Sequence, residues 1–435
     1  MLGALGNIFR VPELKKRVLF SLSMLIVYRI GCHIPTPGID RVAFSLFFKQ
    51  AQGTILGLFD MFSGGALERL TVFALGIMPY ISASIIFQLL TVVIPAIEKL
   101  SKEGESGRKK IIQYTRYGTI VLSVVQGLGI AVGLESMRGS AGELVVPTPG
   151  WTFRFMTVLT LTAGTAFLMW LGEQMSEKGL GNGISLIIFA GIIVRIPTAV
   201  INTLKLINAG QINLIVLILL LALMFFVVAA IVFVERGQRR LPIHYAKRVV
   251  GLKSYNAQTS HLPLKINMAG VIPPIFASSI IMFPATIANF INVPWVQNVS
   301  RMLMPGHWAY NVLFVVFIVF FCYFYTAVTF NPVDVAENIK KHGGYIPGIR
   351  PGQETSDFLD SVLSRLTFVG AAYISVVCVL PSILIGKFNL PFYFGGTALL
   401  IAVGVGMDSV AQIESHLITQ NYEGFLKGVR IRGRK

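Results

Sequence analysis

The residue types that most often perform chemistry are sparse in this sequence and form no reactive pattern. Its three cysteines, Cys32, Cys322 and Cys378, lie in or beside apolar runs without paired spacing, and its six histidines have no HExxH or CxxC motif nearby. These spacings predict neither a disulfide framework nor a zinc site. The string GESGRKK only superficially resembles a phosphate-binding loop, and no GxSxG sequence occurs. We therefore expect neither an enzyme nor a bound cofactor.

Prolines inside apolar runs form a second pattern. Pro79 in GIMPYISAS and the pair Pro273-Pro274 in AGVIPPIFASS each interrupt such a run. Proline removes a backbone hydrogen bond and clashes with the preceding turn, so both helices should kink or break there. Proline is also commoner in membrane helices in general. Because proline occurs at matching positions in the two halves of the chain, the other interpretation is that these helices form a central hinge or line a pathway.

Cations gather in polar segments that are too long to be simple turns. Residues 235–265 carry seven cations and one acid, and residues 331–366 present Arg350 between two Pro-Gly turns. Control of topology and attraction to anionic lipid would explain a few of these cations. The length of both segments favours docking of large cytosolic partners.

Membrane-spanning helices must position these residues. Of 435 residues, 54% are apolar and only 13% are charged. The apolar residues fall in runs of about twenty, the length that crosses roughly 30 Å of hydrocarbon. Ten spans are expected, at residues 18–34, 71–97, 117–137, 153–172, 183–202, 213–234, 266–290, 311–330, 367–386 and 394–415.

The net charge of +17 is unevenly distributed along the chain. With the N-terminus in the cytosol, the inner segments contain 27 Lys and Arg residues and the outer segments contain 7. The remaining three, Arg29, Arg154 and Arg195, lie within spans near their outer ends. This asymmetry is the positive-inside pattern, and ten spans place both termini in the cytosol. The start of the chain lacks a small-residue cleavage site, so we interpret it as mature chain.

The spans divide into two sets of five, and an odd number in each half would give related halves opposite orientations. The alternative suggested by such inverted repeats is a secondary transporter. Transporters usually place ionisable groups near mid-membrane, whereas the middle thirds of these spans hold essentially none. A pathway lined by uncharged side chains binds nothing strongly, so it is better suited to a polymer of varied sequence than to one ion or metabolite. A non-transporting scaffold or insertase is a second alternative, and it would need no apolar waist or plug.

The outer segment 35–70 is too apolar for a solvated loop and too broken for a span. Its end, Leu56 to Ala66, resembles a short apolar helix around Gly64-Gly65 that should fold back into the protein. A surface amphipathic helix is the competing interpretation.

Long strings distributed from about residue 11 to residue 425 resemble the bacterial SecY family of translocon subunits. They include MFSGGALERLTVFALGIMPYISASIIFQLL, KEGESGRKKIIQYTRYGT, LMWLGEQMSEKGLGNGISLIIFAGI, FVERGQRR, HLPLKINMAGVIPPIFASSI, FNPVDVAENIKK, IPGIRPG and PFYFGGTALLI. The resemblance implies an all-α polytopic membrane protein with ten transmembrane helices. Its two pseudo-symmetric inverted halves, residues 1–207 and 208–435, would surround a central pore. It also implies a channel that passes unfolded secretory polypeptides and releases hydrophobic segments laterally into the bacterial inner membrane.

The resemblance further implies three sets of residues in the channel itself. The pore ring would be Ile77, Ile81, Ile184, Ile188, Ile275 and Ile401. The plug, roughly Thr54 to Leu70, would include Leu56, Gly57, Leu58, Phe59, Met61, Phe62, Ser63, Gly64, Gly65 and Ala66. The lateral gate, where helices 2 and 3 part from helices 7 and 8, would include Pro79, Ser82, Ile86, Gln88, Gln126, Pro273 and Ser278.

Partners are implied as well. They are the small membrane subunits SecE and SecG, the SecA motor ATPase, the ribosome with its RNA, signal peptides and nascent polypeptides, and anionic lipids. The docking residues would be Arg239, Arg240, Lys247, Arg248, Lys253 and Arg350. Leu252-Lys253 stands where some relatives carry Arg-Arg, which is a departure from the family pattern at the expected ribosome contact.

Overall fold

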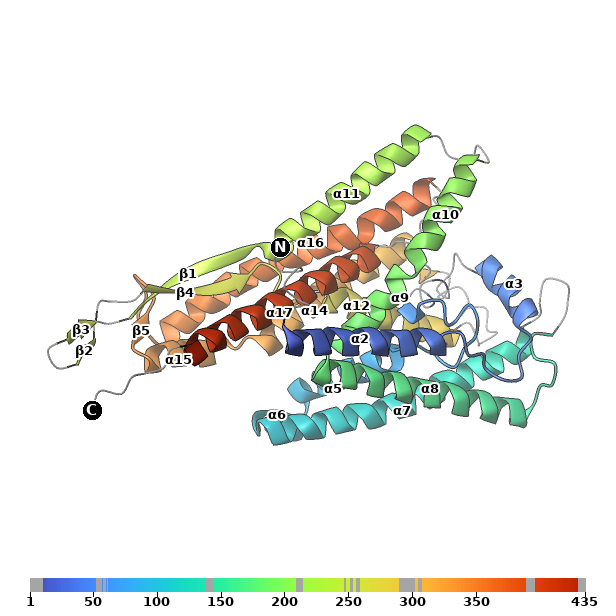
Figure 1. Ribbon diagram of the computed structural model, residues 1–435, viewed down its shortest axis with the longest axis horizontal. Helices are drawn as coiled ribbons and strands as arrows, with labels where there is room; N and C mark the ends of the chain where they lie inside the picture. The colour runs from blue at the N-terminus through green and yellow to red at the C-terminus, as the bar shows by residue number, and fades with distance from the viewer. Residues whose placement is uncertain are drawn as a thin grey trace. The chain divides into compact units, whose positions relative to one another are not determined.

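The protein is described by a computed structural model, in which helices dominate (Figure 1). The described residues are 11–51, 57, 60, 62–137, 144–208, 214–245, 248–250, 253–255, 259–288, 302–303, 307–388 and 396–428. The helices are α2 (Pro12–Gly31), α3 (Arg41–Ala51), α5 (Met78–Val93), α6 (Pro95–Lys102), α7 (Glu105–Ser136), α8 (Trp151–Lys178), α9 (Gly183–Ile193), α10 (Arg195–Asn208), α11 (Leu214–Arg236), α12 (Ile272–Ala288), α14 (Trp308–Thr329), α15 (Pro332–Lys341), α16 (Gln353–Phe388) and α17 (Gly396–Gly428). The strands are β1 (Gln238–Tyr245), β2 (Arg248–Val250), β3 (Lys253–Tyr255), β4 (Thr259–Lys265) and β5 (Gly344–Tyr345).

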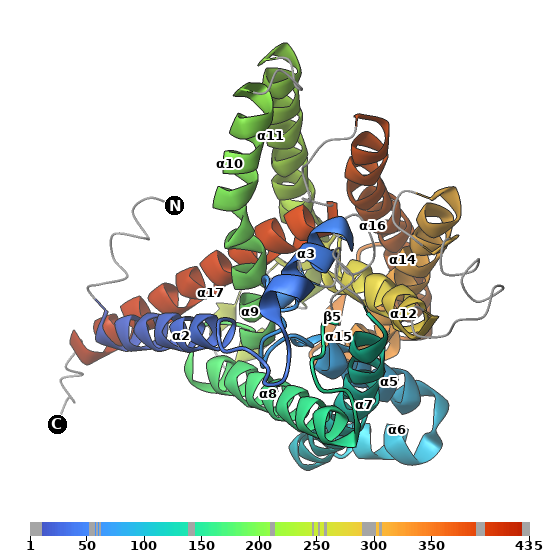
Figure 2. The ribbon, with the colours of Figure 1, turned by 90° about the vertical axis from the view of Figure 1, so that its right-hand side faces the viewer.

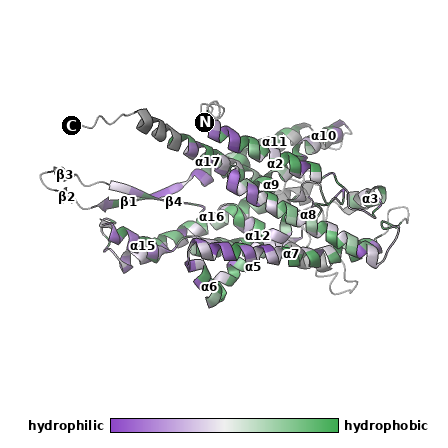
Figure 3. Cartoon of the chain, turned by 60° about the horizontal axis from the view of Figure 1, so that its bottom comes forward, coloured by the Kyte–Doolittle hydropathy of each residue, from purple (hydrophilic) through white to green (hydrophobic). Residues whose placement is uncertain are grey.

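A helix lies at each of the ten expected spans, with α9 and α10 together covering the fifth. Within the described residues, six helical segments are long and apolar enough to cross a membrane, and the bent pair α5–α6 is a seventh candidate. Large apolar side chains such as Phe225, Phe226 and Phe233 are exposed on α11, as expected where lipid replaces water. Hydrophilic residues instead colour much of β1, β4 and α15 (Figure 3).

The chain divides into two compact units that are discontinuous in sequence. The first comprises residues 1–204, 279–305 and 405–435, and the second comprises residues 205–278 and 306–404. Boundaries between the units therefore fall within helices α10, α12 and α17. The predicted halves, residues 1–207 and 208–435, remain a prediction.

In the first unit, α7 packs against both α5 and α8, and α8 also packs against α9 and α2 (Figures 1 and 2). Small residues permit this close packing. At Gly164 of α8, for example, a Cβ atom would collide with the backbone carbonyl of Val72. Helix α9 begins at Asn182, whose side-chain oxygen accepts hydrogen bonds from the backbone N–H groups of Ile184 and Ser185.

In the second unit, α14 packs along α16, and an antiparallel hairpin of β1 and β4 extends from the end of α11 (Figure 1). Strand β1 also pairs with β5, while β2 and β3 form a separate two-stranded sheet. The hairpin stands on a small apolar core, because residues from both strands pack with side chains of α15 and α16. That core contains Leu241, Leu264, Ala336, Ile346, Leu359, Val362 and Leu363.

Both proline sites coincide with helix starts instead of bends within a helix. Pro79 lies in the first turn of α5, where its missing N–H group costs nothing, and residues 64–77 before it form turns and a single bridge at Thr71. Pro273 and Pro274 likewise follow the first residue of α12. The regular helix is thus interrupted as predicted, but the kink is not there. The sharp bend, 99°, lies between α5 and α6 at Pro95.

Candidate functional site

The segment around Gly64 and Gly65 is folded into the first unit. Phe62, Ser63 and Ala66 are each 3% exposed or less, which confirms the folded-back arrangement over the surface helix. The expected helix ends at Ser63, because Gly64 and Gly65 adopt positive φ angles of 66° and 85° and begin a series of turns.

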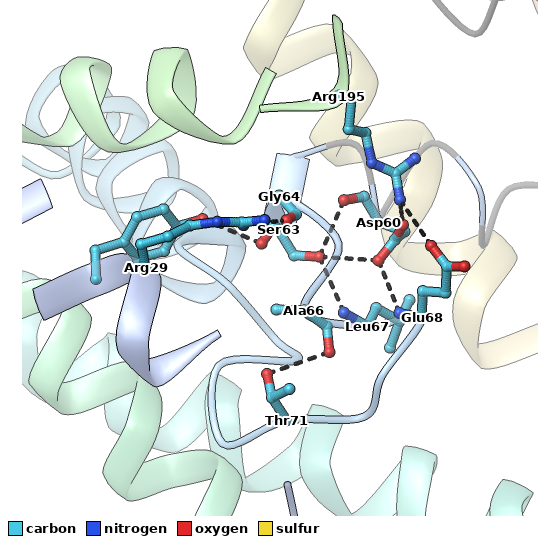
Figure 4. Close-up of polar contacts among 10 residues, drawn as sticks. Arg29, Asp60, Ser63, Gly64, Ala66, Leu67, Glu68, Thr71 and Arg195 are labelled. Carbon is cyan, nitrogen blue, oxygen red and sulfur yellow. Dashed lines mark hydrogen bonds and ion pairs between the residues drawn. The ribbon is translucent and has the colours of Figure 1, made fainter. Parts of the chain in front are cut away.

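Asp60 stabilises this turn through hydrogen bonds (Figure 4). Its side chain is fully buried, and its Oδ1 atom accepts a hydrogen bond from the backbone N–H of Glu68 across 2.8 Å. The Ser63 hydroxyl donates to the Asp60 carbonyl at 3.1 Å and accepts from the backbone N–H of Leu67 at 3.2 Å. One carboxylate and one hydroxyl therefore satisfy backbone groups that the turn would otherwise leave unpaired.

Arg195 reaches the same carboxylate from the start of α10. It forms an ion pair with Asp60, and its Nη2 atom also lies 3.4 Å from Oε2 of Glu68 (Figure 4). The sequence places Arg195 near the outer end of a span, and Asp60 and Glu68 lie within the predicted plug range of Thr54 to Leu70, although neither is among the residues named for it. Two features of the sequence could have indicated this contact, namely acidic residues in an apolar segment and an arginine inside a span.

Helix α2 fastens the other side of the segment. The Tyr28 hydroxyl donates to the carbonyl of Ser63 at 3.0 Å, and Nη1 of Arg29 donates to the carbonyl of Gly64 at 2.8 Å. An isolated bridge joins Pro35 to Thr71. Gly57, Phe62, Ser63, Gly64 and Ala66 are buried and Gly65 is half-buried, whereas Leu56, Leu58, Phe59 and Met61 lie outside the described residues.

The six predicted pore-ring isoleucines fall on four helix starts. Ile77 caps α5, and Ile81 follows one turn later, both 5% exposed or less. On α9, Ile188 is buried, and Ile184 lies close to Gly172 of α8. Ile275 on α12 and Ile401 on α17 are buried in the second unit. The ring that would join the two groups remains a prediction.

The predicted gate residues lie on α5, α7 and α12. Pro79, Pro273 and Ser278 are buried, Ser82, Gln88 and Gln126 are half-buried, and Ile86 is exposed. The Ser278 hydroxyl donates to the carbonyl of Ile275 at 2.9 Å, so it is satisfied within its own helix. Helix α5 belongs to the first unit and the start of α12 to the second. Contact between the gate helices therefore remains a prediction.

Among the predicted docking residues, Arg239 and Arg240 are exposed on β1 opposite Leu264 and Pro263 of β4. The hairpin that carries them was not anticipated as a pair of strands. Arg248 and Lys253 lie in β2 and β3, with no side chains described, and Lys247 lies outside the described residues.

Arg350 directly follows a hydrogen-bonded turn, as predicted from its flanking Pro-Gly pairs. The N–H of Ile349 donates to the carbonyl of Ile346 at 3.1 Å, and Gly348 adopts φ of 82°, which is the geometry of a type II turn. Ile346 anchors this turn in the apolar core beneath the hairpin. The Arg350 side chain is 88% exposed and only 4.0 Å from a carboxylate oxygen of Glu354.

Helices at all ten expected spans, with a buried turn segment folded among those of the first unit, define a polytopic membrane protein. The sequence model of the SecY family matches residues 71–410. Protein translocase subunit SecY of Escherichia coli (strain K12) is 53% identical over 425 residues, covering 97% of this chain and 96% of that protein. The corresponding subunit of Pseudomonas aeruginosa is 52% identical over 436 residues, covering 99% of this chain and 97% of that protein.

Solved structures agree in fold. The structure of a protein conducting channel covers 99% of both chains with a TM-score of 0.69 at 16% identity. Sec61 in the canine ribosome–channel complex from the endoplasmic reticulum also covers 99% of both chains, with a TM-score of 0.62 at 16% identity. The chain belongs to the SecY family and is a protein-translocation channel subunit. This assignment does not support the secondary-transporter alternative.

Proposed function

We propose that this chain forms the pore through which unfolded secretory polypeptides cross a bacterial inner membrane. Hydrophobic segments would leave the pore sideways into lipid. No residue of this chain would catalyse a reaction, and the energy for transport would come from partners.

One observation carries the proposal for the closed state, namely the burial of Asp60, Phe62, Ser63, Ala66 and Leu67 among the helices of the first unit. A segment with a fully buried carboxylate, Asp60, is held there by specific hydrogen bonds from α2 and from within its own turn. Such a segment is ordered enough to act as a plug. It is also joined to the protein at both ends, which allows it to move and return.

The apolar waist is proposed from the isoleucines at the helix starts. Branched apolar side chains such as Ile81 and Ile188 offer no hydrogen bonds to water, so a ring of them excludes water by dewetting. The same ring can surround a passing chain without binding it. Helices α5 and α7 would part from α12 and α14 to open the lateral gate.

The partners that drive transport would dock on the exposed cations of the polar segments. Arg239, Arg240 and Arg350 are exposed cations on ordered turns and strands, suited to the acidic groups of a SecA-type motor or to the RNA of a ribosome. SecE and SecG would complete the complex in the membrane. Both termini would lie in the cytosol, together with residues 235–265 and 331–366, and anionic lipids would contact the cations near the membrane surface.

Deletion of residues 57–66 tests the proposed function. The complex with this deletion should conduct small ions in planar bilayers without a substrate, whereas the parent complex in equal amount should remain closed. Translocation of a secretory substrate into vesicles checks that the deleted complex is assembled. A deleted complex that translocates and yet conducts no more than the parent would contradict the assignment of the plug.

A further inference from the structure

We propose that Arg195 is a positioning residue that latches the plug by bridging its two carboxylates, Asp60 and Glu68. The proposal deepens the proposed function, because it rests on this segment acting as the plug. In this proposal a single cation, on the neighbouring helix α10, holds the segment in its closed position.

The geometry places a single guanidinium across both ends of the turn (Figure 4). Arg195 pairs with Asp60, and its Nη2 atom lies 3.4 Å from Oε2 of Glu68. Asp60 is fully buried, whereas the side chains of Arg195 and Glu68 are 24% and 32% exposed. The two acids are themselves joined, since Asp60 Oδ1 accepts from the backbone N–H of Glu68. The turn at Gly64 and Gly65 is thus stabilised both by hydrogen bonds and by ion pairs.

The position of Arg195 in its own helix supports this role. The fifth span is interrupted at Val194, and Arg195 is the first residue of α10. A cation is unfavourable at a helix N-terminus, where the backbone dipole presents partial positive charge. Arg195 therefore does not stabilise the N-terminus of α10, and its placement is explained by the two carboxylates of the segment.

Close packing adds to the ionic contact. A Cβ atom at Gly64 would lie 2.9 Å from the Cα atom of Gly191, so the turn rests directly on the backbone of α9. Withdrawing the segment would separate the buried Asp60 from its cation. Uncompensated buried charge is strongly unfavourable, which makes the ion pair a barrier to spontaneous opening. A translocating chain must either displace the segment against this barrier or bring hydration that relieves it.

The test compares Arg195→Met and Asp60→Asn with Arg69→Met in the assembled complex. Arg69 is an exposed cation of the same segment, so its replacement removes equal charge without breaking the latch. Two readouts are used, the resting ion conductance in planar bilayers and the labelling rate of a cysteine placed at buried Ser63 in a background without Cys32, Cys322 and Cys378. We expect both readouts to rise on the order of tenfold in the two latch variants and to stay at the parent level in Arg69→Met.

Two further variants separate the latch from general damage. Arg195→Lys keeps the charge and should restore at least part of the closure. The double variant Asp60→Asn/Arg195→Met should rise less than the product of the single effects, because the pair is already broken by either change. The nearly isosteric Asp60→Asn tests the pair from its other side if Arg195→Met does not assemble.

The outcomes distinguish the latch from the plug. If deletion of residues 57–66 conducts while Arg195→Met and Asp60→Asn match Arg69→Met on both readouts, the latch is wrong and the plug stands. If conductance rises without faster labelling at position 63, the leak does not pass through a displaced segment and the latch is also wrong. If the deletion itself does not conduct, both proposals fall.

Discussion

Tyr28 on α2 donates a hydrogen bond to the backbone carbonyl of Ser63 across 3.0 Å, and both residues are buried. The ring of Tyr28 also stacks on Phe73, with their centroids 6.1 Å apart. Arg29 holds the next carbonyl, that of Gly64. The segment proposed as the plug is therefore attached to α2 through two adjacent peptide groups.

The change Tyr28→Phe should weaken the closed state while leaving the packing in place. The ring and its stacking on Phe73 are kept, and only the hydroxyl is lost. Removing one partner of a buried hydrogen bond costs about 1 kcal/mol, which would raise the population of the displaced segment by about fivefold. Resting ion conductance of the complex in planar bilayers measures this. Tyr117→Phe removes an exposed hydroxyl and serves as control; equal conductance in both variants would contradict the role of the bond.

The pore-ring prediction is tested by Ile81→Ser together with Ile188→Ser. Both isoleucines are buried, and serine would offer water hydrogen bonds in place of branched apolar surface. We expect leakage of small ions and looser discrimination between substrates with good and defective signal sequences. Val93→Ser, at a position of α5 that is 73% exposed, is the matched control. A double variant as tight as that control would show that these side chains do not form the waist.

The sequence predicted the spans well because hydropathy and helix length are both dictated by the bilayer. It failed at the ends of elements, where local backbone geometry decides. The predicted second span begins at residue 71, but turns occupy residues 64–77 and α5 starts only at Met78, beside Pro79. The sequence did not predict the β1–β4 hairpin because few of its positions are buried and apolar, namely Leu241 and Ile243 of β1 and Leu264 of β4.

The ionic contacts of the segment proposed as the plug could not be predicted from spacing. Asp60 and Arg195 are 135 positions apart in the sequence, and only the fold brings them together. Arg350 is the opposite case, because its turn is encoded locally by Pro-Gly pairs and the structure confirms it. Features that depend on neighbours in sequence were thus predicted, whereas those that depend on distant packing were not.

The lateral gate predicts a crosslink between cysteines placed at Ser82 of α5 and Ser278 of α12. The native cysteines Cys32, Cys322 and Cys378 are buried and free, so they should first be replaced to leave one reactive pair. Oxidation should lock the resting complex and block export, and a reducing agent should restore it. Quantitative gel shift gives the crosslinked fraction, and translocation into vesicles gives the activity. Full export through a completely crosslinked complex would rule out this gate.

The orientation predicts which side of the membrane labels each loop. Gly104 and Gly343 have positive φ angles of 77° and 72°, so a cysteine there would strain the backbone. The exposed neighbours Lys102 and His342 are better sites. Cysteines at Lys102 and His342 should react with an impermeant reagent only from the cytosolic side, and one at Ser140 only from outside. Labelling of position 342 in intact cells would reverse the assignment.

Arg350→Glu should abolish motor-driven translocation while leaving insertion and assembly intact. The Arg350 side chain is 88% exposed, and its contact with Glu354 is 4.0 Å long, so this pair contributes only about 0–1 kcal/mol to stability. The new glutamate would lie four residues before Glu354, and because both side chains are exposed their repulsion would amount to about 1 kcal/mol at most. Neither effect can unfold a turn anchored by buried Ile346. Loss of transport would therefore report a lost contact with the motor.

Arg350→Lys should retain part of the transport activity, because the charge survives while the planar fork that binds carboxylates and carbonyls is lost. Lys340→Glu, an equal charge reversal at an exposed site of the same segment, should behave as the parent. The separating measurement is translocation-stimulated ATP hydrolysis by the motor on vesicles with equal channel content. Arg350→Glu should remove the stimulation and leave the basal hydrolysis of the motor unchanged. Normal stimulation with this variant would leave Arg350 as a residue of the turn alone, with no part in coupling the motor to the channel.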